Sequence, residues 1–219
     1  MKLSSPGCAR ALVIAACLAL AGCASALEFA RGDPPRLYEL TPKSTFADAL
    51  PEVDARLSVE VPTATAGLNN SRIALRPTAT TLEYYARASW IDVVPVMVQN
   101  LLLESLDNTG RIDVIGREVV GVRADYALLT HVREFQAEYD DQDAPQVRVR
   151  LQARLVRLPR RTSLAATSEE FVVRASATSL SAIVTAFDEA FGKALKRIVE
   201  WTVIQAALAQ DGPGQTQPI

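Results

Sequence analysis

Cys23 is the residue of this 219-residue chain whose type and position point most clearly to chemistry. It ends a Leu-Ala-Gly-Cys tetrapeptide, which follows two cations, Lys2 and Arg10, and an apolar run over residues 11–20. No acidic residue precedes Cys23, and the apolar run is too short to cross a bilayer as a permanent helix. A charged start, an apolar middle and a small-residue end are typical of a secretory signal, so we predict cleavage after Gly22.

The tetrapeptide resembles the lipobox of bacterial lipoproteins. This resemblance implies that Cys23 becomes the first residue of the mature chain and is acylated on its sulfur, so that it would take up a palmitate label. Two or more acyl chains hold a protein stably at a membrane, at about 0.8 kcal/mol for each buried methylene. Ala24, not Asp, follows the cysteine. In such lipoproteins this implies an anchor in the outer membrane, on its periplasmic face. The alternative is a plain secretory signal with an incidental thiol.

Composition excludes several classes of function. Loss of the signal removes two cations and changes the net charge from −2 to about −4, which argues against a nucleic-acid partner or a general anionic-lipid surface. Cys8 and Cys17 leave with the signal, so the folded part has no thiol for a disulfide or a metal. One histidine, His131, remains, and no serine or cysteine nucleophile has a recognisable setting. We therefore predict no catalytic residue, no metal and no cofactor.

The mature chain is predicted to hold one domain. A signal peptide over residues 1–22 precedes a lipidated tether over residues 23–36; the α/β domain covers residues 37–209, and a disordered tail covers residues 210–219. Residue periodicity predicts two helices, residues 93–107 and 180–209, a loop over residues 43–56, and strands over residues 37–40, 57–61, 73–76, 82–88, 112–115, 125–139, 145–158 and 165–174. This order predicts a mixed, mostly antiparallel sheet with two main helices.

The two helices are expected to differ in their surroundings. Asp92 is expected to cap the first helix, whose wide apolar stripe predicts burial, and Ser179 to cap the second. The second helix would be about 45 Å long, which is more than the neighbouring hairpin needs. We therefore expect its end beyond Trp201 to protrude or to contact a partner.

Four aromatic residues are candidates for partner binding: Tyr84, Tyr85, Trp90 and Trp201. The first three lie close together in sequence, and aromatic side chains often anchor protein interfaces. The alternative for these three is that they cover the core beside the first helix. Burial of each side chain would distinguish the two interpretations.

The long hairpin predicted over residues 125–158 carries alternating charges on one face. If Glu138 faces Arg148, then acidic side chains of the first arm meet arginines of the second, in pairs worth a few tenths to about 1 kcal/mol each. The arginine row is therefore predicted to be a paired, solvated face instead of a ligand patch. The acidic loop over residues 140–143 lacks the glycine and terminal glutamate of known calcium loops, so a solvated turn is expected there.

An ordered set of residues resembles a known family. The set consists of a strand ending at Pro62, then Leu68, Ile73, Arg76, Leu82-Glu83-Tyr84-Tyr85, Trp90 and the apolar helix, and later Asp125-Tyr126, Phe135 and Val199-Glu200-Trp201. It resembles the auxiliary lipoproteins of ABC-type transport systems, which include the paraquat-inducible outer-membrane lipoprotein. These accompany transporters that contain mammalian-cell-entry (MCE) proteins. Ser89, where the family often has arginine, departs from the pattern.

The resemblance implies a three-layer α/β domain similar to the N-terminal domain of the TolB periplasmic protein. It also implies a non-enzymatic role, in which the lipoprotein docks the periplasmic MCE assembly to the outer membrane while lipids or other hydrophobic molecules move between membranes. A homo-oligomer, such as a ring, is expected as well. The alternatives are a structural or secretion lipoprotein that forms a ring for an outer-membrane channel, and an anchored hydrolase that uses His131.

Overall fold

The structure is a computed structural model that describes residues 34–115, 123–140 and 143–211. Gly22 and Cys23, the rest of the predicted signal, the tether up to residue 33 and the tail from residue 212 lie outside the described residues. The compact unit begins at Arg36, close to the predicted domain start. Within the described ranges, no helix combines the length and the apolar character needed to cross a membrane.

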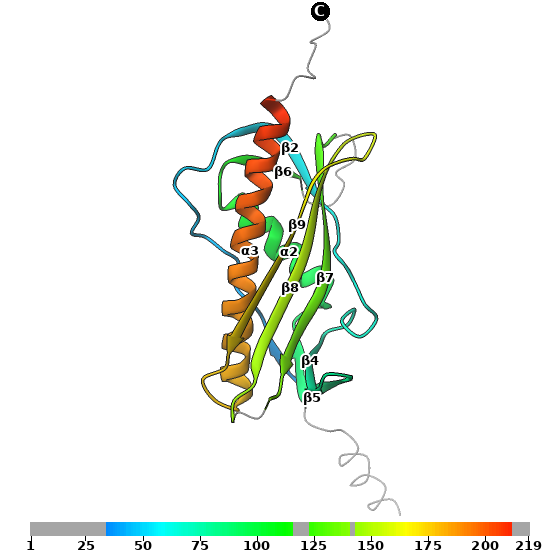
Figure 1. Cartoon of the computed structure of the whole chain (residues 1–219), viewed down its shortest axis with the longest axis vertical. Helices are drawn as coiled ribbons and strands as arrows, with labels where there is room; N and C mark the ends of the chain where they lie inside the picture. The colour runs from blue at the N-terminus through cyan, green and yellow to red at the C-terminus, as the bar shows by residue number, and fades with distance from the viewer. Residues whose placement is uncertain (1–33, 116–122, 141–142, 212–219) are drawn as a thin grey trace, which may run out of the picture. The chain divides into compact units, whose positions relative to one another are not determined.

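The described strands form one mixed nine-stranded sheet, accompanied by two helices (Figure 1). The strands are β1 (Arg36–Tyr38), β2 (Val53–Val59), β3 (Thr63–Ala64), β4 (Arg72–Thr78), β5 (Thr81–Trp90), β6 (Ile112–Ile115), β7 (Tyr126–Glu138), β8 (Gln146–Arg157) and β9 (Thr162–Arg174). The helices are α2 (Val94–Asp107) and α3 (Leu180–Asp211). This arrangement is the mixed α/β fold with a large sheet and two helices that the sequence predicts.

Strand β7 organises the sheet. Along one edge it pairs antiparallel with β8, which pairs antiparallel with β9, and these two pairings are the longest in the described sheet. Three short strands share the other edge of β7 in succession and run parallel to it: β2 at Tyr126, β3 at His131 and β4 at Gln136. Strand β6 extends the sheet beyond β2, and β5 and β1 extend it beyond β4. One long strand therefore aligns residues from several distant segments.

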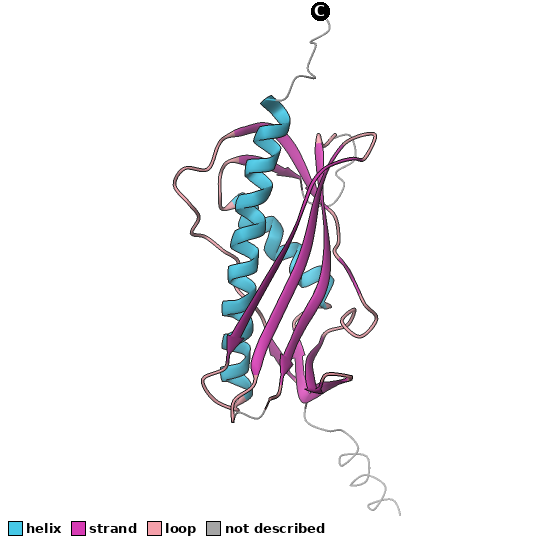
Figure 2. Ribbon diagram, in the orientation of Figure 1, coloured by secondary structure: helices cyan, strands magenta, loops and turns pink. Residues whose placement is uncertain are grey.

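Alternation of residue type creates two faces in the part of the sheet formed by β7, β8 and β9. On β8, Val147, Val149 and Leu151 are buried on the inner face, whereas Arg148 and Arg150 lie between them on the outer face. Helix α3 packs on the inner face of β8 and β9 (Figure 2), and α2 packs on β2, β6 and α3. A section through this region crosses the strands, then α3, then α2.

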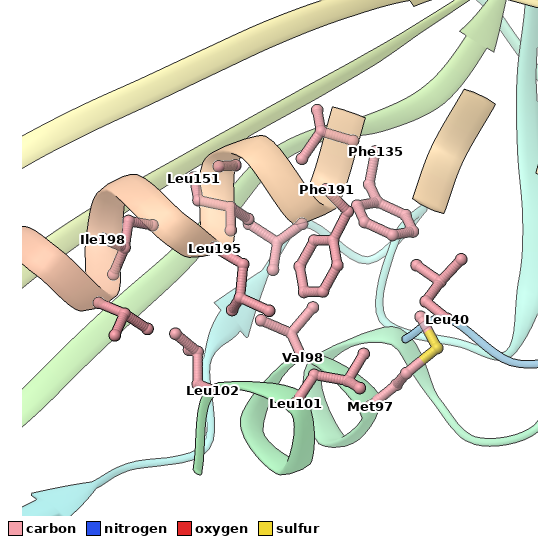
Figure 3. Packing of buried hydrophobic residues seen from close by; sticks show 14 of the residues in the cluster. Leu40, Met97, Val98, Leu101, Leu102, Phe135, Leu151, Phe191, Leu195 and Ile198 are labelled. Carbon is pink, nitrogen blue, oxygen red and sulfur yellow. The ribbon is translucent and has the colours of Figure 1, made fainter. Parts of the chain in front are cut away.

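The core fills the space between the strands and the helices. Figure 3 shows Phe191, Leu195 and Ile198 of α3 beside Val98 and Leu102 of α2. Four aromatic rings meet in this core, with centroid distances of 5.2 to 5.9 Å: Trp90, Phe135, Phe187 and Phe191. Full burial of one large apolar side chain is worth about 1.5–3 kcal/mol, so this packing holds the outer face of the sheet in a fixed geometry.

The helix ends agree with the sequence to within two residues, but one predicted cap is wrong. The N-cap of α2 is Val93 and makes no side-chain cap, while Asp92 Oδ1 accepts a hydrogen bond from the Val93 N–H at 2.7 Å. The expected Asp92 cap is therefore wrong, because the helix begins one residue later. At α3, the hydroxyl of Ser179 accepts a hydrogen bond from the Ala182 N–H at 3.4 Å, as predicted. This helix continues to Asp211, so the first two residues of the predicted tail are helical.

Two strand predictions need correction. The expectation of a loop over residues 43–56 fails from Val53 onward, because β2 gains backbone partners on β6 and β7 that local sequence does not reveal. In the hairpin, Glu138 pairs with Gln146 and not with Arg148, since the ladder continues two residues closer to the turn. Residues 141–142 of this turn, part of the predicted acidic loop, lie outside the described residues. A shift of two residues keeps every side chain on its predicted face.

Candidate interaction surfaces and a binding hollow

Trp90, a predicted partner contact, lies in the core. Its side chain is 1% exposed, and its ring packs edge-on against Phe187 and Phe135 at centroid distances of 5.2 and 5.8 Å. The last position of β5 directs this side chain toward the helices, where apolar burial is most favourable. Trp90 therefore serves packing in this structure and offers almost no surface to a partner.

Tyr84 and Tyr85 lie on opposite faces, because neighbouring residues of a strand alternate. The Tyr84 hydroxyl donates a hydrogen bond to the carbonyl oxygen of Gly67 at 2.9 Å, and the Arg72 guanidinium lies 3.6 Å from the Tyr84 ring centroid. The Tyr85 and Tyr139 hydroxyls are 3.0 Å apart, and burial, together with this contact, raises the pKa of Tyr85. Tyr84, Tyr85 and the buried tryptophan thus do not form one patch, and a partner contact at either tyrosine stays a prediction.

One part of the outer face, near the turn between β7 and β8, is rich in ion pairs. Arg148 Nε lies 3.0 Å from the Glu138 carboxylate, and the same guanidinium pairs with Glu170. Arg150 Nη2 lies 2.8 Å from Glu134 Oε1. We call this region the paired half; it comprises Arg76, Glu134, Gln136, Glu138, Arg148, Arg150 and Glu170.

Gln136 connects the glutamates of the paired half. Its side chain is 1% exposed, and its Nε2 donates hydrogen bonds to Glu134 at 2.8 Å and to Glu138 at 3.0 Å, while its Oε1 accepts one from the Phe135 N–H at 2.8 Å. Burial acts to lower the pKa of Arg148, but hydrogen bonds to its glutamate partners outweigh burial and raise it. These contacts confirm the predicted paired face for this half of the arginine row.

The rest of the outer face contains a hollow of about 470 Å³. Four polar side chains that are in register across four neighbouring strands line it: Thr63 on β3, His131 on β7, Gln152 on β8 and Ser168 on β9. Arg154, one pleat further along β8, lines it as well. We call these five residues and the space between them the donor hollow. No aspartate or glutamate is among its described lining residues.

His131 is the titratable group of the donor hollow. Its Nδ1 lies 2.7 Å from Thr63 Oγ1, and burial, followed by the charge of Arg133, lowers the pKa of His131. The neutral imidazole therefore predominates at pH 7. Its Nε2 is buried and has no hydrogen-bond partner in the described part of the chain. The hydrolase alternative requires a hydroxyl beside this histidine, and Thr63 supplies one, but no acidic group in the described ranges orients the other nitrogen.

Sequence reasoning missed the donor hollow. The five residues lie between 63 and 168 in the chain, and parallel pairing of β3 with β7 brings Thr63 to His131. One signal was present in the sequence: the glutamates of the first hairpin arm stop at Glu134, while the arginines on the outer face of the second arm continue to Arg154. In the predicted hairpin, Arg154 therefore has no glutamate opposite it.

Trp201 belongs to an exposed apolar stripe at the C-terminal end of α3. Ile204 is 41% exposed and Leu208 is 61% exposed, and the spacing from Trp201 puts the three residues on one side of the helix. Trp201 itself is partly exposed and packs partly against the core. We call these three residues the α3 stripe. Grouped exposed apolar side chains are typical of protein-binding surfaces.

The described residues provide groups suited to binding a ligand or an apolar surface. Within residues 34–115, 123–140 and 143–211, no group of three histidine, cysteine, aspartate or glutamate side chains could hold a metal ion. The polar groups of the paired half contact one another, and those of the donor hollow include hydrogen-bond donors, of which Arg154 is charged. Such groups can position and neutralise a ligand, and the α3 stripe can bind an apolar surface.

Comparison with known protein families identifies the family of this chain. Residues 38–199 match the family described as ABC-type transport auxiliary lipoprotein component. The chain belongs to this family. The matched region runs from β1 into α3 and contains the paired half and the donor hollow. As a member, the protein is an auxiliary lipoprotein component associated with ABC-type transport, which is not a known class of enzyme.

Similar proteins agree with this fold. The crystal structure of protein XCC0632 from Xanthomonas campestris has a TM-score of 0.76 and 26% identity, and the match covers 81% of this chain and 99% of that one. A second crystal structure, of an uncharacterized protein, has a TM-score of 0.58 and 12% identity over 77% of this chain and 99% of that one, which shows the fold alone.

A curated relative is longer than this chain. Protein bll6063 of Bradyrhizobium diazoefficiens, named as uncharacterized, is 29% identical over 170 residues, which are 76% of this chain and 44% of that protein. The chain therefore spans less than half the length of this relative.

Proposed function

We propose that the protein is a lipid-anchored adaptor on the periplasmic face of the outer membrane, which docks an MCE-domain protein of the same ABC-type transport system. In this role it has no enzymatic activity, and lipids or other hydrophobic molecules move through its partners. The observation that carries the proposal is the family match over residues 38–199, supported by the signal and lipobox pattern that ends at Cys23.

The α3 stripe is the surface that we assign to the MCE-domain partner. The chain reaches α3 from β1 at Thr41, whose hydroxyl lies 2.9 Å from the Asp188 carboxylate. The stripe begins at Trp201, about 20 Å further along the helix at 1.5 Å per residue. It therefore lies away from the place where the segment after β1 contacts the helix. An apolar surface placed there is accessible to a periplasmic protein.

A pull-down tests the docking proposal. We expect the full-length lipoprotein, solubilised in non-ionic detergent, to recover an MCE-domain protein in stoichiometric amount. The double variant Ile204→Glu/Leu208→Glu should lose this partner, because two charges replace the exposed apolar side chains. Ile91→Glu is the matched control, since Ile91 is also exposed, at 54%, and lies next to β5 and β1, away from the stripe.

The outcomes separate the parts of the proposal. Absence of any transporter component with the wild-type protein would contradict the adaptor role, and recovery of outer-membrane channel proteins in their place would favour the secretion alternative. Equal recovery of the MCE-domain protein with the wild-type and the double variant would support the adaptor role but would show that the α3 stripe is not the docking surface.

The anchor has its own test. We expect cells that express the Cys23→Ser variant to incorporate no palmitate into this protein, because the acylated sulfur is absent. Wild-type protein should carry the label and remain with the outer-membrane fraction. Labelling of the serine variant would contradict the lipobox assignment.

A homo-oligomer is part of the proposal. Strand β9 pairs only with β8 in the described sheet, so its other edge offers 13 residues of backbone to a second copy. Native mass measurement of the detergent-solubilised protein should give a multiple of the chain mass. A monomer across micromolar concentrations would contradict this part.

A further inference from the structure

The donor hollow has a regular construction. Thr63, His131, Gln152 and Ser168 form a continuous row of paired residues from β3 through β7 and β8 to β9. Neighbouring strands are about 4.8 Å apart, so the row spans roughly 14 Å across the sheet. Thr63 Oγ1 and His131 Nδ1 contact each other, and His131 Nε2 is buried. The Gln152 amide and the Ser168 hydroxyl can donate hydrogen bonds to a ligand. The row can therefore serve a ligand that has several acceptor oxygens along its length.

The charge of the hollow is positive and uncompensated. On β8, the cross-strand neighbours of Arg154 are Leu129 and Ala166, and neither side chain can accept a hydrogen bond. Arg154 has no ion pair within the described part of the chain. Arg133 adds a second positive charge near His131 and contributes to its lowered pKa. The protein as a whole is acidic, so this local excess of positive charge is a property of the hollow.

We infer that the donor hollow binds a phosphate-bearing ligand whose other oxygens lie along the row. Arg154 holds the phosphate, because a guanidinium forms strong, charge-assisted hydrogen bonds to phosphate oxygens. Gln152 and Ser168 contact the ester or hydroxyl oxygens next to it. The volume of about 470 Å³ is within the range of small-molecule sites, and it accommodates more than a single phosphate group.

The same chemistry is found in free phosphate esters and in phospholipid headgroups. Both present a phosphate with adjacent glycerol-type oxygens, and the lining residues do not select between them. The inference is independent of the docking proposal, because the hollow lies on the outer face of the sheet and the α3 stripe lies on a helix that packs on the inner face. Failure of either proposal leaves the other intact.

His131 provides a direct measurement. It is the single histidine of the chain, so its imidazole resonances in an NMR spectrum need no assignment. A phosphate bound beside it favours the protonated ring, whereas Arg133 and burial favour the neutral ring. We expect inorganic phosphate, and more strongly glycerol 3-phosphate, to raise the pKa of His131 in a saturable manner. The full-length protein in non-ionic detergent is used, with ionic strength kept constant by chloride.

Two variants and one control locate the binding group. Arg154→Gln should weaken glycerol 3-phosphate binding roughly tenfold or more, since a hydrogen bond to a charged group is lost. Ser168→Glu places a negative charge at an exposed position of the hollow and should abolish binding without disturbing the core. Arg160→Gln, in the exposed turn before β9, removes the same charge outside the hollow and should leave the affinity unchanged.

The results decide whether the hollow binds phosphate and whether its ligand is a lipid headgroup or a free phosphate ester. Saturable binding of glycerol 3-phosphate that also appears with phosphatidylglycerol vesicles, but not with phosphatidylcholine vesicles, supports a headgroup site. Binding of the soluble esters alone supports a site for free phosphate esters. No saturable change in the pKa of His131, or an equal loss with Arg154→Gln and Arg160→Gln, would overturn the inference.

Discussion

The paired half and the donor hollow share strands β7, β8 and β9 and lie on the same face, yet their polar groups are satisfied differently. In the paired half, Arg150 lies 2.8 Å from Glu134 and Arg148 lies 3.0 Å from Glu138. In the hollow, Arg154 faces an alanine and a leucine across the strands. The two regions meet near the irregularity between Val132 and Glu134, where β7 contains one extra residue relative to β8.

This difference indicates which part of the face is available to a ligand. A ligand at the paired half would have to displace ion pairs and a buried glutamine that already satisfy one another. In the hollow, Thr63 and His131 contact each other but Arg154 has no ion pair among the described residues, so fewer existing interactions oppose binding. We therefore propose that the paired half stabilises the hairpin and that the hollow is the binding region. The following predictions test this division, from the largest expected effect to the smallest.

Replacement of Glu134 should have the largest effect on stability. Its side chain is only 15% exposed and contacts Arg150, Gln136 and Arg76. We expect Glu134→Ala to lower the free energy of unfolding by about 2 kcal/mol, because the partners lose a shared acceptor and remain partly buried. Urea unfolding followed by circular dichroism measures the change. A loss no larger than that of an exposed surface variant would contradict the structural role of the paired half.

Two arginines on β8 provide a matched comparison. Arg150→Ala removes a paired guanidinium and should lower the free energy of unfolding by about 1 kcal/mol, whereas Arg154→Ala should change it by less than about 0.5 kcal/mol. Both variants lose the same side chain from the same face of one strand, so their difference isolates the ion pairs. Equal losses in urea unfolding would remove the distinction between the two halves.

The pH dependence of stability should show the smallest effect. Burial and Arg133 lower the pKa of His131 in the folded state, so the unfolded chain binds a proton more readily. The contribution of His131 is therefore fully present above the ordinary pKa of about 6.5 and decreases as the pH falls below it. We expect wild-type protein to lose more stability than His131→Gln between about pH 7.5 and 5.5, in buffers without phosphate. An equal loss, or a larger loss in the variant, would contradict this direction.

Local patterns in the sequence were sufficient to predict the types of the longer elements and the faces of the long strands, but not strand β3. The apolar and charged residues of β8 alternate strictly, and helical spacing defines α2 and α3, so these elements were predicted with nearly correct ends. The observed hairpin register differs from the predicted one by two residues, because the position of the turn depends on how far backbone pairing continues. The cap at Asp92 and the start of β2 at Val53 were missed for similar reasons, since both depend on contacts with other segments.

The candidate sites were less predictable than the fold. The ordered residues that resemble the transport auxiliary lipoproteins led to the correct family. Trp201 is partly buried against the core, and a partner contact at this residue stays a prediction. Trp90 shows the limit of prediction from local sequence. A tryptophan at the end of a strand can face a partner or the core, and the local sequence pattern is the same in both cases; in this structure it faces the core. The donor hollow was not predicted, because its residues come from four strands.

The sequence by itself determined the signal pattern that ends at Cys23, the alternation that gives each strand two faces, and the residue order of the family. These features depend on residues that are close together in the chain. Tertiary structure decided that Thr63 reaches His131, that Trp90 is buried, and that Arg154 has no acidic neighbour among the described residues. The physical reason is that pairing between distant strands follows from packing of the whole core, which no local spacing records.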